Sequence, residues 1–120
     1  MKGIKTNEEL FDENGKYRLD EEYQEIKKLD QMLTEAKIPH TMERMMDGWQ
    51  VCYPVQDPET RVMDAIQHYG SYGHEQDLLE IMGLLTPEEE QCDSVKGWLT
   101  AENVFERIKK HYEQESREEE

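Results

Sequence analysis

The sequence is poor in several residue types, and each shortage excludes a class of protein. Only two of its 120 residues are cysteines, too few for a disulfide-stabilised secreted domain, so we expect a reducing, cytosolic setting. No apolar run approaches the roughly 18 residues that span a bilayer, and the first residues form no apolar signal region. There are 14 basic residues against 29 acidic ones, a net charge of −15, which argues against direct binding of nucleic acid through its phosphates.

Large aliphatic side chains are also scarce. Leu, Ile, Val and Phe make up about 18 per cent of the chain, a level at which disorder is common. Seven Met, six Tyr and two Trp residues add large side chains inside patterned segments. We therefore expect a weakly ordered arm over residues 1–18, a single domain over 19–112, and a disordered acidic tail over 113–120, which contains no apolar residue to bury.

The first element with a clear pattern is a helix. Apolar residues recur at intervals of three and four from Leu19 to Ala36 and predict one amphipathic face. Asp20 is placed to cap the N-terminus, and Pro39 ends the helix because the residue before a proline is disfavoured in helical conformation.

A hairpin is expected to follow. Asp47-Gly48 lies between alternating segments and predicts a two-residue turn. This turn pairs the strands residue by residue: Met46 with Trp49, Arg44 with Val51, and Met42 with Tyr53. These six side chains then share a mostly apolar face against the helix, while the other face is largely polar.

Residues 61–69 fit either of two elements. As a strand they would join the sheet with Val62 and Ile66 turned inward, and as a helix the same two side chains would lie on one face with Tyr69. A strand is favoured, because a two-stranded hairpin is only marginally stable by itself.

The C-terminal part carries signals for helices. Segment 78–82 is predicted as a helix ended by Gly83. Thr86 and Glu89 have capping-box spacing at the start of a second helix, and Thr100 is placed to cap the last. The predicted architecture is α+β: an N-terminal helix, a three-stranded antiparallel sheet, and two or three C-terminal helices.

Catalytic and metal-binding patterns are lacking. The four histidines and two cysteines do not have the spacing of zinc ligands, and no nucleophile is placed beside a base. We therefore expect no enzymatic activity, no metal and no cofactor. The residues concerned are His40, His68, His74, His111, Cys52 and Cys92.

One glycine-rich segment is open to two interpretations. Glycines at the start of a helix let backbone N–H groups converge on an anion, and tyrosines stack on flat ligands, which would make a small nucleotide cradle. The favoured alternative is a flexible connection, because no phosphate-binding motif is present and the net charge repels anions. The segment consists of Tyr69, Gly70, Ser71, Tyr72, Gly73 and His74.

The acidity itself is the main functional clue. Glutamates at i, i+4 spacing on a helix lie about 6 Å apart and approach the spacing of phosphates. One interpretation is a nucleic-acid mimic that occupies a basic groove on a partner protein; the other, which the acidity alone favours, is a merely solubilising charge excess. The candidate partner-binding residues are Glu75, Glu80, Glu88, Glu89, Glu90, Asp93, Glu102, Glu106 and Glu113.

Three runs, 47–54, 66–73 and 77–86, resemble a family of small uncharacterised proteins from prophages and mobile elements of gut Firmicutes. The similarity covers about residues 25–112, and the family has no assigned catalytic residues. The resemblance implies a mobile-element origin and a character similar to that of anti-CRISPR and other anti-defence proteins, many of which block a nucleic-acid-binding surface.

The expected function is therefore that of a non-enzymatic, phage-type inhibitor. Its partner would be a nucleic-acid-binding host defence protein, such as a CRISPR effector, in the bacterial cytosol. A small-molecule or nucleotide binder using segment 69–74 is one alternative, and a phage structural or regulatory adaptor is another.

Overall fold

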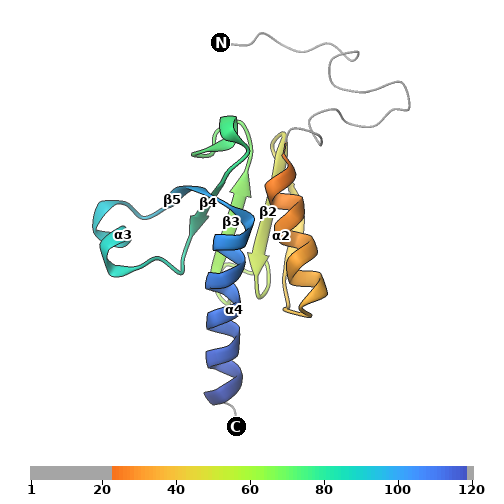
Figure 1. The fold of residues 1–120 in the computed structure, drawn as a ribbon, viewed down its shortest axis with the longest axis vertical. Coiled ribbons are helices and arrows are strands. Elements are labelled where there is room, and N and C mark those ends of the chain that lie inside the picture. Colours follow the sequence, from red (N-terminus) through yellow and green to blue (C-terminus); the bar gives the residue numbers. More distant parts are fainter. Residues whose placement is uncertain (1–22, 119–120) are drawn as a thin grey trace.

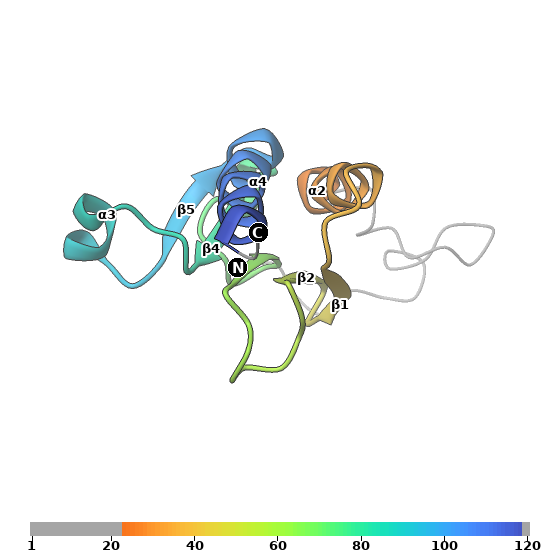
Figure 2. The same cartoon turned by 90° about the horizontal axis from the view of Figure 1, so that it is seen from below.

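A five-stranded antiparallel sheet organises residues 23–118, the part of the chain that the computed structural model describes (Figure 1). The strands follow one another in chain order: β1 (Thr41–Met45), β2 (Gly48–Tyr53), β3 (Met63–Gln67), β4 (Leu79–Met82) and β5 (Lys96–Leu99). Two long helices, α2 (Gln24–Glu35) and α4 (Ala101–Glu118), lie side by side on one face (Figure 2). The short helix α3 (Pro87–Cys92) projects from the β4–β5 connection, and the one-turn 3₁₀ helix η2 (His74–Gln76) precedes β4.

The prediction of a three-stranded sheet is wrong, because β4 and β5 add two strands. Segment 78–82 contains the whole of β4 instead of a helix, with Leu79 and Ile81 buried and Met82 exposed. A run this short has too few residues for its periodicity to distinguish a strand from a helix. β5 has no strand pattern in the sequence because it contains Gly97, a residue that weakens strands.

The register of the β1–β2 hairpin also differs from the prediction. Arg44 pairs with Trp49 and not with Val51, and the turn is formed by Met46 and Asp47. Each residue of β1 therefore pairs with a β2 residue two positions earlier than predicted, because the turn begins one residue earlier.

Gly48 explains this displacement. It begins β2 and lies so close to β3 that a Cβ atom there would be 1.8 Å from the carbonyl oxygen of Gln67. The glycine is thus needed for the close approach of two strands, and Met46 supplies a positive φ of 56° in the turn. Because the register differs from the prediction by an even number of residues, Met42 and Arg44 still share a face with Val51 and Trp49.

Segment 61–69 contains a strand, β3, as favoured. Its orientation is the reverse of the prediction, because Met63, Ala65 and Gln67 are buried while Ile66 lies on the opposite face. Val62 precedes the strand. Pairing with β2 decides the orientation, since it sets Ala65 opposite the buried Val51.

The core lies between the sheet and the two long helices. The spacing predicted for the first helix is confirmed at Ile26, Leu29 and Leu33, which are fully buried in α2. The helix ends at Glu35, before Pro39, while the predicted cap Asp20 and the arm over residues 1–18 lie outside the described residues.

The caps predicted for the two C-terminal helices are confirmed. Thr86 and Glu89 form a reciprocal capping box at α3, and the Thr100 hydroxyl accepts a hydrogen bond from the N–H of Asn103 at 3.1 Å. Helix α4 continues to Glu118, into the segment assigned to the acidic tail. Glu, Gln, Lys and Arg are good helix formers, so they extend an existing helix without burial.

Helix α2 is capped by a side chain distant in sequence. Asp77 Oδ1 accepts hydrogen bonds from the backbone N–H groups of Gln24 (2.9 Å) and Glu25 (3.2 Å), and from Nε2 of the fully buried Gln67 (2.6 Å). Gln67 turns its Oε1 to the N–H of Ile26 at 3.1 Å. Two side chains thereby satisfy three of the N–H groups that a helix start leaves free, and they hold α2 over the sheet.

We predict that Asp77→Ala lowers the free energy of unfolding by about 2–3 kcal/mol, because it leaves several N–H donors without their acceptor. Asp77→Asn is the matched control: it keeps an acceptor oxygen and tolerates the positive φ of 56° at this position, so about 1 kcal/mol or less is expected. Urea denaturation measures both, and a loss below about 0.5 kcal/mol in the alanine variant would rule out this role for Asp77.

Candidate interaction surface

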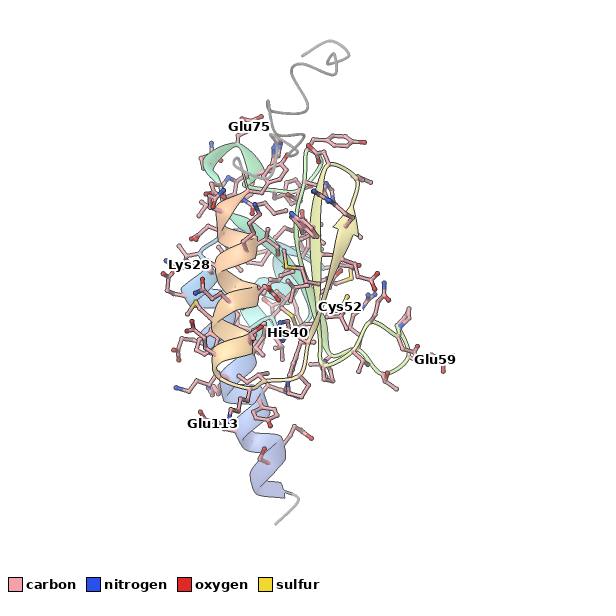
Figure 3. All side chains as sticks on the ribbon, turned by 90° about the vertical axis from the view of Figure 1, so that its right-hand side faces the viewer. Lys28, His40, Cys52, Glu59, Glu75 and Glu113 are labelled. Carbon is pink, nitrogen blue, oxygen red and sulfur yellow. The ribbon has the colours of Figure 1, made fainter. Side chains whose placement is uncertain are left out.

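The nine candidate carboxylates do not form one surface. Glu75 in η2 and Glu113 in α4 lie at opposite ends of the molecule (Figure 3). Glu88, Glu90 and Asp93 are exposed on or directly after α3. A continuous row of charges that imitates a phosphate backbone is therefore not formed by these residues.

Two of the nine carboxylates form ion pairs with a lysine or an arginine of the molecule itself. Arg107 of α4 donates two hydrogen bonds to Glu89 of α3, from Nη1 to Oε1 at 2.7 Å and from Nη2 to Oε2 at 2.9 Å. This fork lowers the pKa of Glu89 from 4.5 to about 2 and ties the projecting helix to α4. Glu102 forms an ion pair with Lys28 of α2, which lowers the pKa of the carboxyl.

Two further candidates on α4 lie among basic side chains. Glu106 and Glu113 line a shallow groove along the helix together with Lys109 and Lys110. The two signs of charge alternate there, so this groove does not offer a uniformly acidic surface to a cationic partner.

The glycine-rich segment 69–74 is already occupied by carboxylates of the protein itself. The N–H of Tyr69 donates to Asp47 Oδ1 at 2.9 Å, and the N–H of Tyr72 donates to Glu80 Oε1 at 2.9 Å. These oxygens stand where the oxygens of a bound phosphate would accept hydrogen bonds.

Three other backbone donors of this segment are also engaged. The N–H of Gly70 donates to His68 Nδ1 at 2.9 Å, that of Ser71 to the His68 carbonyl at 3.0 Å, and that of His74 to the Ser71 carbonyl at 3.4 Å. Burial lowers the pKa of His68, so its ring offers no positive charge at neutral pH. The arrangement disfavours an anion cradle.

Tyr53, His111 and Glu115 form the first of two chains that resemble catalytic groups. The Tyr53 hydroxyl lies 2.8 Å from His111 Nδ1, and His111 Nε2 lies 3.7 Å from Glu115 Oε1. Burial raises the pKa of Tyr53 to about 12, so the phenol stays protonated at neutral pH and joins β2 to α4 by a hydrogen bond.

Asp30, Thr34 and His40 form the second chain. In a nucleophile–base–acid triad, one ring nitrogen faces the acid and the other faces the nucleophile. Here Nε2 of His40 faces both, at 2.8 Å from Asp30 Oδ1 and 3.4 Å from Thr34 Oγ1, while Nδ1 lies 2.8 Å from the Ile38 carbonyl. This geometry does not activate the threonine hydroxyl.

Residues 23–118 contain neither a metal-ligand cluster nor a membrane-spanning helix. Among residues 23–118, no three His, Cys, Asp or Glu side chains are grouped to hold a metal ion. No helix in that range has the length and apolar character needed to cross a membrane.

The outer face of the sheet, opposite the helices, is the most distinctive surface. In Figure 2 the helices cover one side of the sheet, and the loop 54–62 lies on the other. Neighbouring strands place a row of side chains across this outer face, and Met82 lies beside the row. The row consists of Glu43, Gln50, Ile66 and Glu80.

An aromatic pair stands at the β4–β5 end of this face. The rings of Tyr72 and Trp98 are stacked, with centroids 5.5 Å apart and planes 14° from parallel. They remain 50% and 57% exposed, and Met82 is 54% exposed. The sequence does not predict this pair, because Tyr72 and Trp98 are distant along the chain. The only local signal is Gly97, which allows the close approach of Tyr72.

Comparison with protein-family models, curated proteins and solved structures finds no match to this chain.

We predict that nucleotides leave the melting temperature of the protein unchanged, to within about 1 °C, because five of the six backbone N–H donors of segment 69–74 already have acceptors. Differential scanning fluorimetry with ATP, GTP and cyclic mononucleotides at millimolar concentration measures this. A ligand that binds only the folded state raises the melting temperature, so an increase of several degrees would restore the cradle interpretation.

We predict that protonation of Glu89 in the Glu89–Arg107 ion pair lowers the free energy of unfolding at acidic pH. Because the pKa of Glu89 is lower in the folded chain, its contribution is complete above pH 4.5 and is lost as the pH falls towards 2. Wild type should lose about 1–2 kcal/mol more than Glu89→Gln over this interval, after allowance for partial exposure. The glutamine keeps an acceptor for the capping box. Equal losses of stability in wild type and Glu89→Gln between about pH 4.5 and about pH 2, measured by urea denaturation, would refute the assignment.

Proposed function

We propose that this chain is a non-enzymatic inhibitor of mobile-element origin, which acts in the host cytosol by covering a basic, nucleic-acid-binding surface of a defence protein. The observation that supports this best is the outer face of the sheet. There the exposed Tyr72–Trp98 pair and Met82 lie beside Glu80, on a chain with a net charge of −15.

The composition of this face suits a protein partner. Aromatic and methionine side chains are enriched at the centre of protein interfaces, where their burial provides much of the binding energy. A purely electrostatic mimic would need a dense row of carboxylates, whereas here the apolar contact and a few charges would act together. We therefore propose that the partner binds Tyr72, Trp98 and Met82, and not a surface made of the nine carboxylates.

The scattered carboxylates have a supporting role in this proposal. Glu88, Glu90 and Asp93 are exposed on the projecting α3 segment and add to the negative field of the chain. Such a field accelerates encounter with a cationic surface and weakens as salt is added. The resemblance to phage-borne proteins supports a defence protein as the target.

The proposed function predicts competition with nucleic acid. Proteins captured from a bacterial lysate by the immobilised chain are identified, purified and titrated with labelled DNA or RNA. A saturating amount of the chain should weaken nucleic-acid binding by about tenfold or more, because both ligands need the same surface. The interaction with the chain should itself weaken between about 50 and about 200 mM salt.

Two outcomes would contradict the proposal. One is a captured protein whose affinity for nucleic acid is unchanged when it is saturated with the chain. The other is the absence of any stoichiometric partner that binds nucleic acid.

A further inference from the structure

We infer that the outer face recognises an arginine of the partner, whose guanidinium stacks on the Tyr72–Trp98 pair and forms an ion pair with Glu80. The inference rests on the proposed function and names the chemistry of the contact. A second copy of this chain is the competing occupant, and the experiment separates the two.

The aromatic pair is already in place before any partner binds. The N–H of Trp98 donates to the carbonyl of Tyr72 at 3.4 Å, which links β5 to the loop. A Cβ atom at Gly97 would lie 2.3 Å from the Cβ of Tyr72, so only glycine allows this approach. Because both rings are held by these contacts, binding does not have to order them, and less entropy is lost.

A carboxylate is fixed beside the rings. Glu80 Oε1 accepts the hydrogen bond from the N–H of Tyr72 at 2.9 Å, and Glu80 lies on the outer face opposite Ile66. Within residues 23–118, no lysine or arginine forms an ion pair with Glu80. A cation placed over the rings would therefore meet a negative charge that the described part of the chain does not neutralise.

Arg61, in the loop on this face, directs its guanidinium away from Glu80. Arg61 Nη1 donates to Cys52 Sγ at 3.3 Å and to the carbonyl of Gln56 at 3.4 Å. Asp64 accepts a hydrogen bond from Gln50 at 2.7 Å. Neither contact involves Glu80, which lies two residues from the exposed, apolar Met82.

Arginine fits this surface better than lysine. A planar guanidinium stacks on an aromatic ring and donates to a carboxylate at the same time, whereas an ammonium acts as a point charge. The molecule makes both contacts internally: the Arg44 Cζ atom lies 4.0 Å from the Trp49 ring centroid, and Arg107 grips Glu89 in a fork. The structure therefore combines, at Glu80 and Trp98, two interactions that it already uses separately.

The probes for the test are two peptides of equal length and charge, nona-arginine and nona-lysine. Binding to the full chain is followed by ¹H–¹⁵N NMR, in which the indole N–H of Trp98 reports on the aromatic pair and that of Trp49 serves as an internal reference. We expect nona-arginine to bind about fivefold more tightly than nona-lysine and to move the Trp98 signal selectively.

Three variants localise the contact. Glu80→Gln keeps the acceptor for Tyr72, and Trp98→Asn tolerates the positive φ of 56°, so both should fold. Each should weaken nona-arginine binding about fivefold, while Glu90→Gln on α3, which removes the same charge elsewhere, should change it less than about twofold.

Equal effects of Glu80→Gln and Glu90→Gln, or equal affinity for the two peptides, would overturn the inference. So would a dimer in sedimentation velocity that Trp98→Asn dissociates, because a second copy would then cover the face. The proposed function is judged separately, by the nucleic-acid competition with the captured protein. If that competition persists unchanged in the Glu80→Gln and Trp98→Asn variants, the proposed function stands and the arginine site fails.

Discussion

The carboxylate of Asp77 is the contact on which much of the structure depends. It caps α2 and holds Gln67, and so joins the helical layer, the third strand and the end of η2 at one point. The segment between Gln67 and Asp77 contains Tyr72, whose N–H is fixed by Glu80. Anchoring both ends of this segment therefore also positions the aromatic pair on the outer face.

The acidic residues of this chain serve different purposes despite their common charge. Asp77 and Glu89 complete helix ends and ion pairs, while Asp47 and Glu80 satisfy backbone donors of the loop 69–74. Glu88 and Glu90 of α3, and Asp93 directly after it, remain in solvent and contribute only to the overall field. A net charge of −15 consequently overstates how much negative charge is available to a partner, and it does not reveal where that charge lies.

Local sequence signals predicted the caps of the C-terminal helices, and contacts between distant residues account for several of the failures. The caps at Thr86 and Thr100 involve neighbouring residues and were predicted. The hairpin register depends on Gly48 against Gln67, and the aromatic pair depends on Gly97 against Tyr72, neither of which a short window contains. Of the candidate site residues, Glu80 and Tyr72 are placed together by β4, a strand that the sequence analysis assigned to a helix.

In the proposed function, the outer face of the sheet, and not the helical layer, meets a cationic partner. Cross-saturation NMR on the complex with a captured protein tests this claim directly, because it maps the residues in contact. We expect the residues in contact to be centred on Tyr72, Glu80, Met82 and Trp98. A footprint centred on α4, or on the acidic residues of α3 alone, would contradict it.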